Sequence, residues 1–253
     1  MAKGEVVVTA DKLKKRKKRE RITMIVLLSL LLLLIIAYFI LRIVYSTGSF
    51  IINMDKNTYL NSNLVMYESL NDRSSVIKLS TAKLEFMDNI SIRWLPDNIN
   101  REAEGAHNGE NYIAHSFYLE NQGEETINYW YSVTIDDIIK NVDDAVRVMI
   151  FINDDRTVYA KRSPITGKEE PVYYSNRAIE TTTPFLDEEE EDGTIIRASR
   201  KGMNPGERDK VTVVIFLEGD DPECVNAILG GELKMHMDIY EEHVEEKMRN
   251  NKE

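Results

Sequence analysis

A run of twenty residues without a charge, a proline or a glycine occupies positions 22–41 of the 253-residue sequence. Its polar groups are Thr23, Ser29 and the hydroxyl of Tyr38, and most of the remainder is leucine and isoleucine. A helix of this length spans roughly 30 Å, the thickness of the hydrocarbon core of a bilayer. Because such a helix is apolar all round, it has no polar face to turn toward water. The run predicts a single transmembrane helix, with the lipid bilayer as its partner.

A cleaved secretory signal is the competing interpretation, because it too has a basic segment followed by an apolar one. The apolar region of a signal is usually about 7–15 residues long and precedes an A-x-A-like cleavage site. This run is longer, and no A-x-A follows it, although Val44-Tyr45-Ser46 is a passable substitute. The length therefore favours an uncleaved signal anchor, which we place at residues 22–45.

The charges on the two sides of the apolar run have opposite signs. Nine basic and three acidic residues give the first 21 positions a net charge of +6, whereas 22 basic and 40 acidic residues give the chain after Tyr45 a net charge of −18. Basic flanks stay on the cytoplasmic side of a membrane. We therefore expect a basic cytoplasmic tail at residues 1–21, whose cluster at 14–21 contacts anionic headgroups, and an extracellular location for residues 46–253. The acidic exterior argues against a nucleic-acid partner.

The sequence after residue 45 predicts mainly β-structure. A charged fraction of 30% excludes a polytopic membrane protein, so most of these residues must fold in water. Alternating or continuous apolar patterns predict strands at 83–94, 112–120, 127–135, 146–152, 157–161, 211–217 and 233–239. Many short strands with turn signals between them are typical of an antiparallel β-sandwich, which we place at 81–240. We predict short helices at 136–144 and 223–229.

The regions that flank the predicted sandwich are polar. We expect residues 46–80 to form a stalk with short strands, in which the apolar patch 50–52 could add as a strand to an exposed sheet edge of another molecule. Residues 241–253 read as a charged tail, and the acidic run 187–192 as a solvated loop.

Histidines and cysteine give little support for catalysis. The four histidines are scattered, and no HExxH motif places two of them on one helix face. They are His107, His115, His236 and His243. The single Cys224 has no histidine near it in the sequence, so we expect a small buried residue and not a nucleophile. The sequence therefore predicts no catalytic and no cofactor-binding residue.

Two groups of acidic residues are candidates for calcium sites. One comprises Asp220, Asp221 and Glu223, and the other is the turn Asn153-Asp154-Asp155. Neither has the spacing of a known calcium loop. We favour a helix N-cap for the first group and an ordinary hairpin turn for the second, and predict no metal ligand.

The C-terminal third resembles a family of bacterial surface proteins. A strand, a turn and a returning strand run from Val214-Ile215-Phe216-Leu217-Glu218-Gly219-Asp220-Asp221-Pro222-Glu223-Cys224 to Gly230-Gly231-Glu232-Leu233-Lys234-Met235, and residues 117–123 precede them. This pattern is similar to camelysin/TasA-like proteins and related membrane-anchored proteins of Firmicutes. The resemblance implies a jelly-roll-like sandwich outside a Gram-positive cell, in a family where some members build filaments and others are described as metalloproteases. Those proteins usually carry a cleavable signal, and no catalytic residue can be transferred to this chain.

We therefore expect a membrane protein with its N-terminus inside and its C-terminus outside, acting in surface binding or assembly with a protein partner or with copies of itself. A tethered metallopeptidase and an accessory subunit of an envelope machine are the alternatives.

Overall fold

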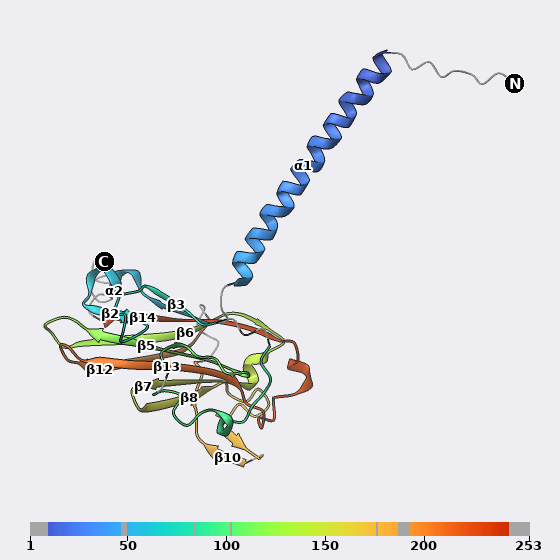
Figure 1. Ribbon diagram of the computed structural model, residues 1–253. Coiled ribbons are helices and arrows are strands. Elements are labelled where there is room, and N and C mark those ends of the chain that lie inside the picture. The colour runs from blue at the N-terminus through green and yellow to red at the C-terminus, as the bar shows by residue number, and fades with distance from the viewer. Residues whose placement is uncertain are drawn as a thin grey trace, which may run out of the picture. The chain divides into compact units, whose positions relative to one another are not determined.

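The computed structural model describes residues 10–46, 50–82, 84, 86–101, 103–175, 177–186 and 193–242 (Figure 1). The chain divides into two compact units, Met1–Thr47 and Gly48–Glu253. The predicted acidic run 187–192, His243 and most of the tail at 241–253 lie outside the described residues.

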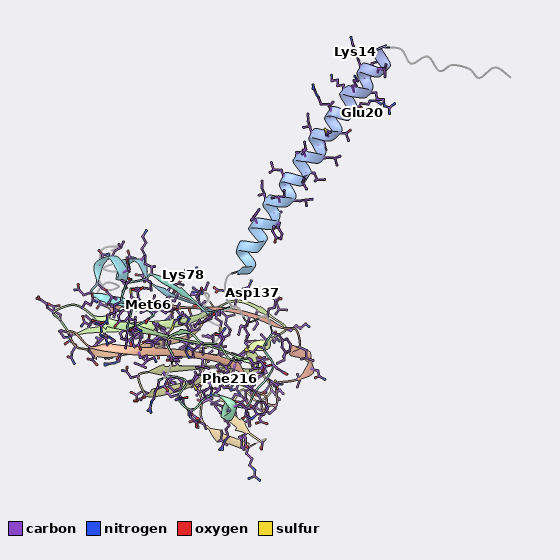
Figure 2. All side chains as sticks on the ribbon, in the orientation of Figure 1. Lys14, Glu20, Met66, Lys78, Asp137 and Phe216 are labelled. Atoms are coloured by element: carbon purple, nitrogen blue, oxygen red, sulfur yellow. The ribbon has the colours of Figure 1, made fainter. Side chains whose placement is uncertain are left out.

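The first unit contains one long helix, α1 (Ala10–Ser46). The stretch Leu13–Phe39 is long and apolar enough to cross a membrane, a property that a signal sequence near an N-terminus would share. Its large apolar side chains are between 44% and 66% exposed, and Figure 2 shows side chains projecting on all sides of the helix. The basic segment belongs to the same helix, where Arg16 Nε lies 3.0 Å from Glu20 Oε1 one turn later.

The second unit is built mainly from two sheets. The first has the strand order β12 (Thr194–Met203), β6 (Ile127–Ile139), β14 (Glu232–Glu241), β1 (Phe50–Met54) and β3 (Lys78–Ser80). The second has the order β11 (Thr183–Pro184), β8 (Asp155–Ala160), β7 (Val146–Ile152), β13 (Arg208–Leu217), β5 (Tyr112–Asn121) and β2 (Leu64–Tyr67), with β4 (Gly105–Ala106) beside β5. Neighbouring strands are antiparallel except in the pairs β1–β14 and β8–β11. A separate hairpin joins β9 (Val172–Tyr174) to β10 (Arg177–Glu180).

The main core lies between the two sheets. Phe50, Tyr129 and Met237 from the first sheet belong to one buried cluster with Phe117 and Val213 from the second. The predicted strands at 112–120, 127–135, 146–152, 157–161, 211–217 and 233–239 are all present. The mainly β, sandwich-like fold predicted from these patterns is confirmed.

The second sheet is covered on its outer face as well. Met149, Val214 and Phe216 form a smaller buried cluster there with Ile90 and Ile92, which belong to the segment before β4. Burial on both faces explains why β7 and β13 are apolar almost without interruption. It also corrects the strand predicted at 83–94. Within the described residues of that segment there is an isolated bridge at Ile90 and the 3₁₀ turn η1 (Ile92–Trp94). Ile90 and Ile92 therefore cover the sheet and do not form a strand in it.

Residues 50–80 are part of the folded unit and not a stalk. They supply β1, β2 and β3 together with the short helix α2 (Lys56–Asn61). β1 lies between β14 and β3 and pairs with both. The segment 50–52, which we expected to pair with another molecule, therefore already pairs on both sides within this chain. The sequence pattern missed this because the partner β14 is distant along the chain, and a five-residue strand has no visible period of its own.

Both predicted short helices are reduced to single 3₁₀ turns. β6 continues to Ile139, and the backbone then takes positive φ values at Lys140 (63°) and Asn141 (50°), which an α-helix cannot contain. The turn η2 (Val142–Ala145) follows. In the second region, η3 (Asn226–Ile228) is preceded by Val225, whose side chain makes no capping hydrogen bond.

Candidate functional site

A buried group of carboxylates lies where the loop after β13 meets the segment before β9. Asp221 and Glu223 belong to that loop, and Glu170 comes from the other segment. Each carboxylate offers one oxygen that lies within 4.8 Å of the oxygens offered by the other two. Among the described residues, these three form the one group of acids, histidines or cysteines whose atoms are close enough to hold a metal ion. We refer to Glu170, Asp221 and Glu223 as the carboxylate cluster.

The loop after β13 is held by hydrogen bonds that leave the carboxylates inside. The amide of Glu218 donates to Ala145 O (2.9 Å), and the amide of Cys224 donates to Asp221 O (3.0 Å). Asp221 Oδ1 accepts a hydrogen bond from the amide of Glu223 at 2.7 Å, which closes a local turn. The predicted helix N-cap at residues 220–223 is therefore wrong, because Asp221 caps a turn and the first residue of η3 is Asn226.

Neighbouring side chains donate hydrogen bonds to some of the carboxylate oxygens of the cluster. Tyr173 donates its hydroxyl hydrogen to Glu170 Oε1 at 2.6 Å, and Ser163 donates to Glu223 Oε1 at 2.7 Å. Glu223 Oε2 is shielded from solvent and has no hydrogen-bond partner. An unsatisfied buried oxygen of an acidic group is costly, so this atom needs a proton or a cation.

The positive charge at the cluster comes from Arg147 on β7. Its side chain is 0% exposed, and Nη2 lies 2.5 Å from Asp221 Oδ2. The same nitrogen donates to Pro171 O at 3.3 Å. The guanidinium therefore pairs with one of the three carboxylates, and the cluster keeps a net negative charge when all three are ionised.

A fourth acid, Glu218, follows β13 directly and adds to this imbalance. It is fully buried, and neither carboxylate oxygen has a hydrogen-bond partner. Burial raises the pKa of Glu218 to about 7, against the opposing effect of Arg147 and with help from the charges of Asp220 and Asp221. Burial, followed by the neighbouring carboxylate of Asp221, also raises the pKa of Glu223. Negative charge is therefore unfavourable around the loop after β13.

The histidines considered from the sequence do not assemble into a site. His107 has its ring nitrogens 2.8 Å from Gly105 O and 3.2 Å from Ile99 O. His236 lies on the outer side of β14, as predicted, with Nδ1 2.8 Å from Asp136 Oδ1. Neither of these two rings nor His115 is part of the carboxylate cluster.

His115 is fully buried on β5. Burial, followed by the charge of His107, lowers its pKa to about 4. Glu68 Oε1 lies 3.2 Å from Nε2 and would favour the charged ring, but this carboxylate is half exposed and is screened by water. Burial therefore dominates, and His115 is a neutral core residue near pH 7.

The second acidic group is a structural turn, as predicted. Asn153 has a positive φ of 58° between β7 and β8, and its Oδ1 accepts a hydrogen bond from the amide of Lys210 (2.9 Å). Asp154 pairs with Arg101, with Oδ1 and Nε 3.0 Å apart. Asn153 and Asp154 therefore have partners within the chain, as side chains of a hairpin turn do.

Cys224 is half-buried next to the carboxylate cluster. Asn89 Nδ2 donates to its Sγ at 3.4 Å, and burial raises the pKa of the thiol. A thiol with a raised pKa is a poor nucleophile near neutral pH, which agrees with the role expected from the sequence.

Sequence reasoning found Asp221 and Glu223 but missed Glu170 and Arg147. Glu170 lies in a polar segment and is brought to the cluster by the tertiary fold alone. Arg147 did carry a signal, because a charge inside the apolar run Val146–Ile152 requires a buried partner of opposite charge.

Comparisons with known proteins find no family and only weakly similar solved structures. No family model and no curated protein matches the chain. Solved structures that match include β-glucosidase from Kluyveromyces marxianus in complex with glucose, at 10% identity and a TM-score of 0.25, and the selenomethionine-labelled form of that enzyme, at 11% and 0.26. The matches cover 74% of this chain but 16% and 17% of the two enzyme chains, so this chain spans about a sixth of their length. Superpositions this poor support no conclusion about fold or activity.

Proposed function

We propose that the protein is a single-pass membrane protein of a Gram-positive-type bacterium that displays its β-sandwich outside the cell for surface binding or assembly. The observation that carries the proposal is the exposure of the apolar side chains of α1. Its large apolar side chains between Leu13 and Phe39 are exposed all round, and the helix forms a unit distinct from the β-sheets. Water is an unfavourable solvent for such a surface, and a bilayer is a favourable one.

The orientation rests on charge. Residues 14–21 contain seven basic side chains and one acidic one, and residues after Tyr45 carry −18. The basic end is favoured on the cytoplasmic side, where anionic headgroups attract it. The resemblance to camelysin/TasA-like surface proteins, which implies a sandwich outside the cell, remains part of this proposal.

A tethered metallopeptidase is less well supported. Catalytic zinc sites usually combine histidine with one or two acidic or cysteine ligands around an open coordination position. The described histidines lie apart from the carboxylate cluster, and that cluster is buried. We therefore keep binding or assembly as the proposed function.

Retention of the helix is the first testable part of the proposal. We expect the full 29.2 kDa chain in the membrane fraction after a high-salt wash, because apolar burial and not surface charge holds it there. Intact-mass measurement of the extracted protein checks this directly. As a control, Leu31→Arg combined with Leu32→Arg should abolish membrane retention, since each charge at the helix centre costs about 3 kcal/mol. A shorter chain that begins near Ser46 and appears in the medium would show instead that the helix is a cleaved signal.

A further inference from the structure

We propose that the carboxylate cluster of Glu170, Asp221 and Glu223 is a binding site for one Ca²⁺ ion. This proposal is independent of the proposed function, since it concerns the inside of the β-sandwich unit and not its membrane anchor or its surface.

The spacing of the oxygens fits one coordination sphere. Calcium binds oxygen at about 2.3–2.6 Å, so two ligands on opposite sides of the ion lie about 4.6–5.2 Å apart. The three carboxylates offer oxygens that are all within 4.8 Å of one another. A single ion between them can therefore contact all three without a rearrangement of the backbone.

The unsatisfied oxygen is a second and separate observation. Glu223 is 8% exposed, its Oε1 is bound by Ser163, and its Oε2 is buried with no partner. Native proteins rarely leave such an atom without a donor or a cation. Glu223 belongs to the cluster, so its carboxylate would bind a cation held there, and Oε2 is the oxygen of Glu223 that no hydrogen bond occupies.

The charge balance favours a divalent ion. Without Glu218, three ionised carboxylates and the guanidinium of Arg147 leave a net charge of −2, which one divalent cation offsets. A cation relieves the repulsion between these carboxylates. The gain in free energy is larger in the interior than at the surface, because the local dielectric constant is low.

The donor atoms select the type of ion. All three ligands offer oxygen, which suits a hard cation and not zinc or copper. Mg²⁺ requires near-ideal octahedral geometry and usually keeps several waters, whereas Ca²⁺ accepts irregular sets of 6–8 oxygens. The buried, irregular cluster, with Ser163 beside it as a further oxygen donor, therefore favours Ca²⁺.

A bound ion would connect segments that are far apart in the sequence. Glu170 precedes β9, whereas Asp221 and Glu223 follow β13. A ligand that binds the folded state and not the unfolded chain raises the melting temperature. We therefore expect the Tm of the β-sandwich unit to rise on addition of Ca²⁺ and to fall when a chelator removes it.

The test uses the full chain in detergent micelles after treatment with chelator. Isothermal titration with CaCl₂ should show one site per chain, with a Kd below about 1 mM, the weak end of the range for extracellular calcium modules. MgCl₂ should bind about tenfold more weakly, because an irregular cluster does not supply the octahedral geometry that Mg²⁺ requires. The Tm should rise with CaCl₂ over the same concentration range.

Two substitutions and one control locate the site. Glu223→Gln and Glu170→Gln each keep the side-chain shape but remove a charged ligand, and each should weaken Ca²⁺ binding by about tenfold or more. Asp220→Asn should bind Ca²⁺ like the wild type, because Asp220 lies outside the cluster and accepts a hydrogen bond from the amide of Ser175. Circular dichroism shows whether each variant is folded, and either cluster variant suffices if the other does not fold.

Three results would overturn the proposal. The first is the absence of Ca²⁺ binding and of any Ca²⁺-dependent change in Tm at about 5 mM, well above the expected range. The second is unchanged binding by a folded Glu223→Gln or Glu170→Gln variant, which would place the ion elsewhere. The third is tighter binding of Mg²⁺ than of Ca²⁺. A cluster that shares a proton and holds no ion would give the first result.

Discussion

Replacing Arg147 with methionine should lower the free energy of unfolding by about 3–5 kcal/mol, because it leaves buried carboxylates without their positive partner. Arg147 and Asp221 are fully buried as side chains and approach to 2.5 Å. Glu218, already without a partner for either oxygen, would lose the favourable charge of the guanidinium as well. Urea unfolding of the full chain in micelles, followed by tryptophan fluorescence, measures the change.

The same substitution at a more exposed ion pair provides the control. Arg156 on β8 lies 2.5 Å from Glu180, but its side chain is 38% exposed. Arg156→Met should therefore cost less than about 1 kcal/mol. An Arg147→Met variant that is no less stable than Arg156→Met would show that the buried charges are compensated in some other way.

Phe50→Ala should destabilise the β-sandwich unit by about 3–5 kcal/mol, since it opens a cavity in the main core. Phe50 is 0% exposed on β1, where it lies opposite Met235 of β14. Thermal and urea unfolding of the variant measure the loss. A loss of this size would support β1 as a core strand. In the stalk expected from the sequence, residue 50 would contribute little to the free energy of unfolding.

Phe86→Ala is the matched control for this experiment. Phe86 is 70% exposed, so the same change should alter the free energy of unfolding by about 0.5 kcal/mol or less. Equal effects of Phe50→Ala and Phe86→Ala would contradict the placement of β1 in the core.

The strands that could be predicted are those in which the pattern of apolar residues shows which faces of the strand are buried. β6 alternates because one face is buried, and β7 and β13 are continuously apolar because both faces are covered. β1 could not be predicted in this way, because it joins the sheet through β14, its partner in a register from Phe50↔Met235 to Met54↔Ile239. Local patterns do not contain such distant pairings.

The candidate site was predictable only in part, for a similar reason. Asp221 and Glu223 lie together in the sequence, so their acidic character is visible there, but the local pattern favours a helix cap. Burial decides between a cap and a binding site, and it depends on Glu170 and Arg147, which come from other segments. The charge inside the apolar run Val146–Ile152 was the one local sign of a buried charged partner.

The most direct test of the central claim is the side of the membrane on which each unit lies. In a Cys224→Ser background, Lys14→Cys labels the basic segment of α1 and Ile165→Cys labels the β-sandwich unit at a side chain that is 80% exposed. In intact bacterial protoplasts, a membrane-impermeant maleimide should modify the Ile165→Cys variant at once and the Lys14→Cys variant only after the cells are permeabilised. Labelling of the Lys14→Cys variant alone in intact protoplasts would contradict the account.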